Sequence, residues 1–227
     1  MNDPGVAPLI AIVGTDGSGK STVATALLAW MRERYPTELH HLGKQTGHIG
    51  RAIARWPLVG RRLDKAIVRK AGVAPESDPP GTIAAIVIFA FSMRRVRRFR
   101  RMLAARGRGV AILTDRFPQA AVPGPMDGPG LARVRGAGLP ALLAARERKH
   151  YAWMESVAPD LVLRLNVDLA TALARKPDHR ASSLQTKIAD VARLSFNGAP
   201  IVDLDATRPL DEVIARCKAA IEDVLRR

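Results

Sequence analysis

One segment near the start of the chain constrains the fold more than any other, because an apolar run leads directly into a glycine-rich turn. Leu9 to Val13 is apolar throughout and stops at a glycine, which predicts a buried central strand. Residues 21–34 then carry apolar side chains at helical spacing. The turn between the two reads Gly14-Thr15-Asp16-Gly17-Ser18-Gly19-Lys20-Ser21, which is the spacing of a phosphate-binding loop.

This loop predicts how a nucleotide would be held. Glycines let the backbone turn tightly and direct successive N–H groups inward, and the N-terminus of the following helix adds positive partial charge. Lys20 would reach the β- and γ-phosphates of ATP, and Ser21 would hold Mg²⁺. We therefore expect ATP and Mg²⁺ as cofactors. The expected cofactor-binding residues are Gly14, Thr15, Asp16, Gly17, Ser18, Gly19, Lys20, Ser21 and Thr22.

The rest of the chain alternates short apolar runs with amphipathic segments. We predict further strands at 38–42, 110–114, 161–165 and 201–204, and helices at 83–103, 139–157, 169–174, 183–196 and 209–227. A basic segment at 49–73 is also helical in pattern. This alternation predicts an α/β protein with the P-loop NTPase fold: a central, mostly parallel five-stranded sheet, helices on both faces and a lid. A chain of 227 residues has the size of one such domain, so we assign 1–227 to a single domain.

A charged pair follows one of the predicted strands. Asp115 and Arg116 stand at the carboxyl end of the strand at 110–114, the edge at which open α/β sheets bind ligands. Asp115 could contribute to a Mg²⁺ site, and Arg116 could bind a phosphate with its planar fork of donors. A structural ion pair that closes the strand is the alternative.

The landmarks together resemble the thymidylate kinase family. They are Gly14 to Thr22, Asp115-Arg116-Phe117, Pro159 to Val162, and Val202 to Thr207 ahead of the last helix, in the order that the family keeps over most of the chain. The resemblance implies an ATP-dependent kinase that phosphorylates a nucleoside monophosphate.

The resemblance also implies roles for individual residues. Asp16, Phe91, Arg95 and Arg116 would bind the acceptor, with Phe91 stacked on its base and Arg95 hydrogen-bonded to it. The implied catalytic residues are Lys20, Asp115, Arg116, Arg175 and Arg180. Arg175, Lys176 and Arg180 would belong to a short lid at about 175–183, and which of these cations neutralises the transferring phosphoryl group is open. Ala206 would pass beside the adenine, and Ser21 and Asp115 would hold the metal.

The chain departs from the family around the acceptor. Lys44 and Gln45 stand where the family usually has an arginine that grips the acceptor phosphate, an insertion spans about 52–82, and a loop rich in Pro and Gly occupies 118–138. An acceptor other than dTMP is therefore open. If that acceptor is a nucleoside or another alcohol, Asp115 or Asp16 would be the candidate base.

The net charge and the composition limit the classes of partner that the protein could bind. The chain has 36 basic and 21 acidic residues, a formal net charge of +15, which favours anionic partners such as ATP and a phosphate-bearing acceptor. A basic ATPase on nucleic acid is an alternative, but only 4% of the residues are aromatic, too few to suggest stacking platforms. We expect neither a nucleic-acid nor a membrane partner, a cytoplasmic location since no signal peptide is visible, and leave a homodimer open.

Overall fold

The computed structural model of the protein describes residues 6–43, 80–123 and 126–226. The basic segment predicted to be helical at 49–73 lies outside these residues. Lys44, Gln45 and most of the insertion at 52–82 lie outside them as well.

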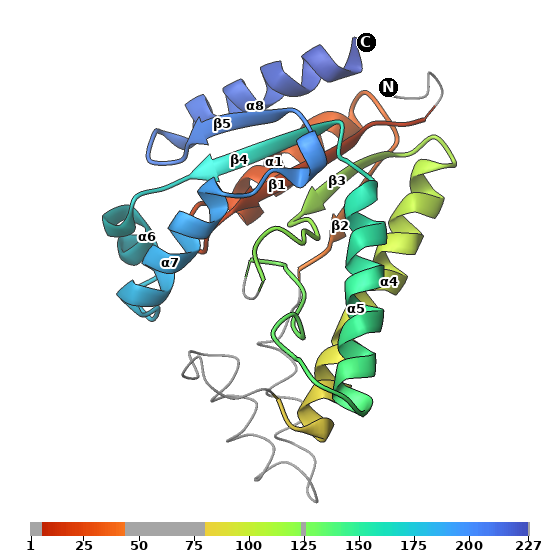
Figure 1. Ribbon diagram of the computed structural model, residues 1–227. Coiled ribbons are helices and arrows are strands. Elements are labelled where there is room, and N and C mark those ends of the chain that lie inside the picture. The colour runs from red at the N-terminus through yellow and green to blue at the C-terminus, as the bar shows by residue number, and fades with distance from the viewer. Residues whose placement is uncertain (1–5, 44–79, 124–125, 227) are drawn as a thin grey trace, which may run out of the picture.

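The sheet is parallel throughout and has the strand order β2-β3-β1-β4-β5 (Figure 1). The strands are β1 (Leu9–Gly14), β2 (Thr37–His41), β3 (Ala111–Asp115), β4 (Leu161–Asn166) and β5 (Ile201–Asp205). The prediction of an α/β fold with five strands is confirmed. Ile12 of β1 pairs with Asp115 of β3, so the residues that follow these two strands meet at one edge of the sheet.

Helices cover both faces of the sheet. On one face lie α1 (Lys20–Arg32) and α8 (Leu210–Leu225), and on the other lie α4 (Thr82–Arg106) and α5 (Leu139–Ser156) (Figure 1). Two shorter helices, α6 (Leu169–Arg175) and α7 (Ala181–Ala192), follow β4 at the carboxyl edge. The segments at the carboxyl edge of the sheet are therefore connected to helices that pack on its two faces.

The central strand β1 serves two hydrophobic cores because successive side chains of a strand point to opposite faces. Ile10 and Ile12 belong to the core under α1 and α8, whereas Leu9, Ala11 and Val13 belong to the core under α4 and α5. Each of these residues is at most 4% exposed. Burial on both faces explains the unbroken apolar run from which the strand was predicted.

The prediction of a helix at 183–196 is wrong at its end. Helix α7 stops at Ala192, and a 3-10 turn follows at Phe196–Gly198. Phe196 and Asn197 have positive φ angles of 48° and 54°, and Phe196 packs into the core under α4 and α5. The apolar periodicity continued past the helix because the chain after α7 still faces a core.

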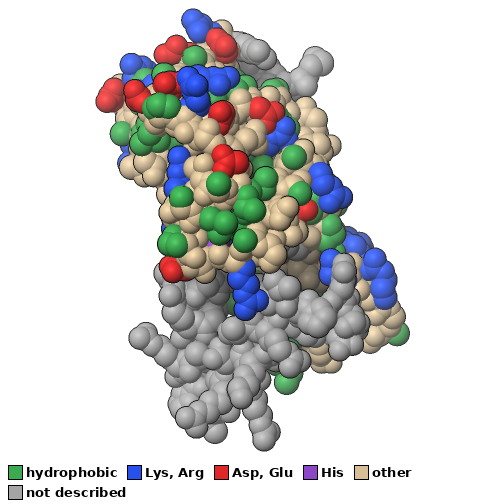
Figure 2. Space-filling model, turned by 90° about the vertical axis from the view of Figure 1, so that its left-hand side faces the viewer, with side chains coloured by type: hydrophobic (Ala, Val, Ile, Leu, Met, Phe, Trp, Pro, Cys, Tyr) green, Lys and Arg blue, Asp and Glu red, His purple; other side chains and the backbone are tan. Residues whose placement is uncertain are grey.

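The surface carries charges of both signs. On the face shown in Figure 2, basic and acidic side chains are interspersed toward the upper end of the molecule. No helix within the described ranges is both long enough and apolar enough to cross a membrane.

Candidate active site

The phosphate loop connects β1 to α1 as predicted, and its glycines carry the unusual backbone angles. Gly17 and Gly19 have φ angles of 85° and 82°, in the left-handed region that side chains disfavour. At Gly14 a Cβ atom would lie 2.6 Å from Ser18 Oγ and 2.7 Å from the Leu165 carbonyl oxygen, so only glycine fits there. These positions explain why the motif requires glycine.

Lys20 is folded back onto the loop that precedes it. Its ammonium group donates a hydrogen bond to the carbonyl oxygen of Thr15, which also accepts one from Ser18 Oγ at 2.9 Å. Only 8% of Lys20 is exposed, and its burial, together with the charge of Arg116, lowers its pKa from 10.5 to about 8. An anion bound beside Lys20 would therefore stabilise the charged form of its ammonium group.

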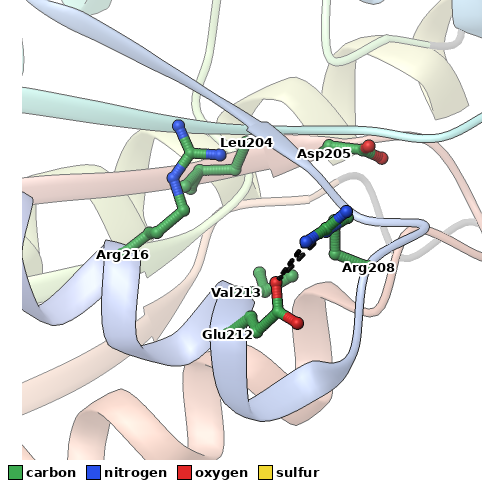
Figure 3. Close-up of a pocket in the computed structure, with 6 residues that line it drawn as sticks. All are labelled: Leu204, Asp205, Arg208, Glu212, Val213 and Arg216. Atoms are coloured by element: carbon green, nitrogen blue, oxygen red, sulfur yellow. Dashed lines mark hydrogen bonds and ion pairs between the residues drawn. The ribbon is translucent and has the colours of Figure 1, made fainter.

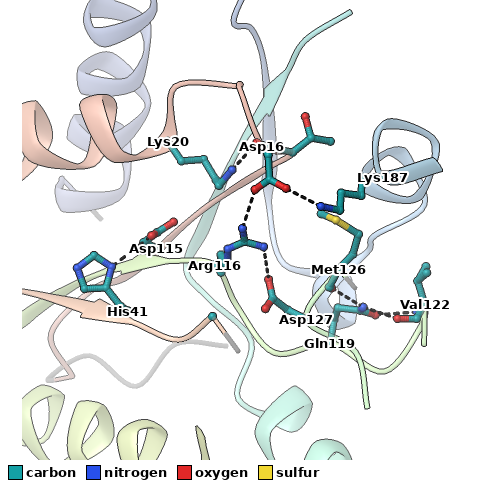
Figure 4. Close-up of polar contacts among 12 residues, drawn as sticks. Asp16, Lys20, His41, Asp115, Arg116, Gln119, Val122, Met126, Asp127 and Lys187 are labelled. Carbon is teal, nitrogen blue, oxygen red and sulfur yellow. Dashed lines mark hydrogen bonds and ion pairs between the residues drawn. The ribbon is translucent and has the colours of Figure 1, made fainter. Parts of the chain in front are cut away.

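Asp16 is the point at which the charged side chains of the site meet (Figure 4). Its Oδ1 lies 3.0 Å from Arg116 Nη2, and its Oδ2 lies 2.6 Å from Lys187 Nζ and 3.8 Å from His179 Nε2. Burial by itself would raise the pKa of Asp16. The hydrogen bond and charge of Lys187, with the charges of Arg116 and Lys20, outweigh burial and lower that pKa from 3.8 to about 2.

Arg116 lies between two carboxylates. Nη2 faces Asp16, and Nη1 lies 3.5 Å from Asp127 Oδ2. Its backbone has a positive φ of 68°. This conformation is strained for a non-glycine residue, and such strain is concentrated at functional sites. Burial would lower the pKa of Arg116, but the charges of Asp127, Asp16 and Asp115 raise it.

Asp115 fits a role in holding Mg²⁺. Its Oδ2 lies 3.2 Å from His41 Nδ1, whereas its Oδ1 is buried and has no hydrogen-bond partner among the residues that the structure describes. A carboxylate oxygen without a partner and a serine hydroxyl, that of Ser21 at the start of α1, are oxygen donors of the kind that Mg²⁺ takes. These donors are compatible with the metal.

The two residues implied to recognise the acceptor base lie on α4. Phe91 is half-buried, and Arg95 is 1% exposed. The guanidinium of Arg95 donates to Asp127 Oδ1 at 2.6 Å, to the Asp127 carbonyl oxygen at 2.7 Å and to Tyr151 Oη at 2.8 Å. Arg95 is thus engaged with its own chain.

The predicted lid residues fall in two different places. Arg175, the last residue of α6, donates to the carbonyl oxygens of Gly17 at 3.2 Å and Ala206 at 2.9 Å, so it joins the back of the phosphate loop to the segment after β5. Arg180 is exposed and stands at the residue before α7, where its side chain makes no capping hydrogen bond within the described chain. The structure brings Ala206 within reach of the loop through Arg175.

Two residues of the cluster were not predicted from the sequence. Lys187 stands on α7 three residues after the buried Leu184 and four before the buried Val191, so a lysine on the apolar face of a helix was the available signal. Asp127 lies in the Pro/Gly-rich loop, where no periodicity indicates which side chains point inward.

The described residues also form a cavity of about 340 Å³ beside β5 and α8 (Figure 3). It is lined by Leu204, Asp205, Arg208, Glu212, Val213 and Arg216. Arg208 Nη2 lies 2.9 Å from Glu212 Oε2 at the edge of this cavity. None of the cations around Asp16 is among its lining residues. We take the cluster at Asp16 as the site, because anion binding and phosphoryl transfer depend on converging donors and charge more than on an empty volume.

The fold and this site define a P-loop protein of the kinase-like class. No protein-family model matches the chain. It is 44% identical over 221 residues to the uncharacterized ATP-binding protein YghS of Escherichia coli K12, covering 96% of this chain and 93% of that protein. It is also 37% identical over 217 residues to YghR of the same strain, which is likewise named an uncharacterized ATP-binding protein, covering 94% and 86% of the two chains.

The chain therefore belongs to the protein family that contains YghS and YghR. A more distant relative is a probable thymidylate kinase of Pyrobaculum aerophilum, 27% identical over 228 residues, covering 96% of this chain and 97% of that protein.

Proposed function

We propose that the protein binds ATP with Mg²⁺ and transfers the γ-phosphoryl group to a small phosphate-bearing acceptor, with a nucleoside monophosphate as the acceptor class. The observation that carries this proposal is the convergence of Lys20, Arg116 and Lys187 around Asp16 at the carboxyl edge of β1 and β3. The names of the relatives, two ATP-binding proteins and one probable thymidylate kinase, support it.

The residues divide the task between them. The backbone of the phosphate loop and Lys20 bind the ATP phosphates, while Ser21 and Asp115 would hold the metal, which supplies positive charge at the phosphate oxygens when bound. Arg116 and Lys187 add positive charge on the acceptor side. Phosphoryl transfer needs little covalent help from the protein, since alignment and electrostatic stabilisation account for most of the rate.

The charge state of Asp16 favours a phosphate over a hydroxyl as the acceptor. A general base works best when its pKa lies near the working pH, and the pKa of Asp16 is held at about 2. An acceptor that is already a phosphate needs no base. An alcohol acceptor, which would use Asp115 as its base, is the second candidate because one oxygen of Asp115 is buried without a partner in the described part of the chain.

The test is ADP release from ATP, coupled to a detection system and measured against a panel of nucleoside monophosphates, nucleosides and no acceptor. We expect turnover with at least one monophosphate. In Lys20→Ala we expect the rate of ADP release to fall by about a hundredfold or more. Lys218→Ala is the matched control, because Lys218 lies on α8 over the Trp30 ring, near the end of α1 opposite to Lys20. Turnover with nucleosides alone would replace this proposal by the alcohol kinase, and no turnover with any acceptor would reject both.

A further inference from the structure

The carboxylate of Asp127 connects two arginines from different elements. Its Oδ1 lies 2.6 Å from Arg95 Nη2 on α4, and its Oδ2 lies 3.5 Å from Arg116 Nη1 after β3. The side chain of Asp127 is 7% exposed and that of Arg95 is 1% exposed. Figure 4 shows Arg116 held between Asp127 and Asp16. One carboxylate therefore contacts both Arg116, which lies beside the phosphate loop, and Arg95, which lies on α4.

The loop that presents Asp127 is built to keep it there. Gln119 is 1% exposed; its amide nitrogen donates to the carbonyl oxygens of Val122 at 2.6 Å and Met126 at 2.8 Å, and its amide oxygen accepts from the Val122 N–H at 2.7 Å. At Gly128 a Cβ atom would lie 2.1 Å from the Val122 carbonyl oxygen, so the loop closes too tightly for a side chain there.

Farther along, the fully buried Glu147 of α5 holds the next residues of the same loop. Its carboxylate accepts from the backbone N–H groups of Gly130 at 3.1 Å and Leu131 at 2.6 Å, and from the hydroxyl of Ser92 on α4. Asp127 itself has a positive φ of 66°, a conformation that costs a non-glycine residue free energy and persists when its surroundings enforce it. The two anchors supply that enforcement.

We propose that Asp127 is a positioning and specificity-determining residue of the acceptor site, an inference that rests on the proposed function. It withholds Arg95 from the acceptor by occupying both Nη atoms of that guanidinium, through its carboxylate and its carbonyl oxygen. It also orients Arg116 toward Asp16 and the phosphate loop. The acceptor is then recognised through its phosphate by Arg116, not through its base by Arg95.

The consequence is a weak dependence on the base. An arginine that makes a paired hydrogen bond to a base discriminates against the wrong base by roughly ten- to a hundredfold. With both Nη atoms of Arg95 hydrogen-bonded inside the protein, that discrimination is absent from this position. Removing the Asp127 carboxylate restores it, because an unpaired buried arginine favours any new acceptor that it can reach.

The experiment compares wild type with Asp127→Gly, which suits the positive φ and removes the carboxylate, and with Asp127→Asn, which keeps the size of the side chain. Calorimetry measures the binding of deoxyribose 5-phosphate, dTMP and dGMP to each protein, independently of turnover. We expect wild type to bind the three within about threefold. We expect either variant to change the ratio of the dissociation constants of the base-free and base-bearing ligands by about fivefold or more.

Asp160→Asn is the matched control. Asp160 forms a similar buried pair with Arg106, at 2.8 Å and with 4% of its side chain exposed, but it binds the N–H of Leu9 at the opposite edge of the sheet. This variant should lower the melting temperature without changing the binding ratio. Ratios that stay the same in both Asp127 variants, an equal change in Asp160→Asn, or no binding of any of the three ligands by wild type would overturn the inference.

Turnover separates the two proposals. If wild type phosphorylates a monophosphate and the ratios do not change, the inference fails and the proposed function stands. If wild type binds the ligands without phosphorylating them, the proposed function fails, and the ratios still decide the role of Asp127.

Discussion

Lys187 Nζ lies 2.6 Å from Asp16 Oδ2, although 171 positions separate the two residues in the chain. The contact ties helix α7 to the phosphate loop. His179, in the segment between α6 and α7, approaches the same carboxylate oxygen at 3.8 Å. One acidic residue of the loop is thus hydrogen-bonded to the helix that follows the predicted lid and lies close to His179 within that lid.

We expect Lys187→Met to destabilise the protein by about 1 kcal/mol at pH 7, because it removes the main group that lowers the pKa of Asp16. The folded pKa of about 2 lies below the unfolded value of 3.8, so this stabilisation is complete above pH 4 and disappears as the pH falls toward 2. The difference from wild type should shrink over the same range in urea unfolding experiments. Lys187→Arg keeps the charge and is the control; a difference that is independent of pH would contradict the assignment.

ATP binding should take up protons above about pH 8. In the free protein the pKa of Lys20 is about 8, and the phosphates would raise it by their negative charge. The affinity for ATP should therefore fall as the pH rises through this value, and calorimetry in buffers of different ionisation enthalpy should show the proton uptake. Lys20→Arg stays charged over this range and should bind ATP, if it does, without the pH dependence. A wild-type affinity that is flat between pH 7 and pH 9 would argue against a lowered pKa.

Asp115→Asn should raise the Mg²⁺ concentration needed for half-maximal activity by about tenfold or more. The reason is that the amide oxygen lacks the negative charge with which Oδ1, buried and without a partner among the residues that the structure covers, would bind the metal. A magnesium titration of the rate at saturating ATP measures the effect. Asp223→Asn, at an exposed carboxylate on α8, should leave the titration unchanged, and an equal shift in both variants would refute the metal role of Asp115.

Gly17→Ala should destabilise the protein more than Gly19→Ala. The two glycines have nearly the same φ, 85° and 82°, so both variants lose about 1 kcal/mol to the left-handed conformation. At Gly17 the new Cβ would lie 2.9 Å from the Ala172 carbonyl oxygen, whereas at Gly19 no atom from the described parts of the chain lies within 4 Å. Urea unfolding should show the extra loss, of about 1 kcal/mol or more, in Gly17→Ala alone. Equal losses would mean that the loop can move away from α6.

Much of the fold could be predicted because its signals are local. The apolar run from Leu9 to Val13 is buried on both faces, and its exit into a glycine-rich turn specifies a strand, a phosphate loop and a helix in that order. The spacing of Asp115 and Arg116 after a second apolar run placed them at the same edge of the sheet, where β1 and β3 pair. Each of these inferences needs only a few consecutive residues.

The acceptor side could not be predicted in the same way. Periodicity indicates which face of α4 is buried, but it does not tell whether Arg95 faces a ligand or a carboxylate of its own chain. The answer depends on Asp127, 32 positions away in a loop without periodicity. Arg175 likewise matched a lid cation in sequence order, and its guanidinium reaches the carbonyl oxygens of Gly17 and Ala206.

Short-range patterns of burial and backbone freedom encode the phosphate loop, the parallel α/β architecture and the residues at the ends of the strands, so these features follow from the order of the amino acids. Which charges meet follows from the three-dimensional fold. Asp16 is surrounded by Arg116 and Lys187, and Asp127 lies between Arg95 and Arg116, because helix α7 and the loop after β3 fold back to the same edge. Charge pairing depends on distance in space, and a linear sequence does not record that distance.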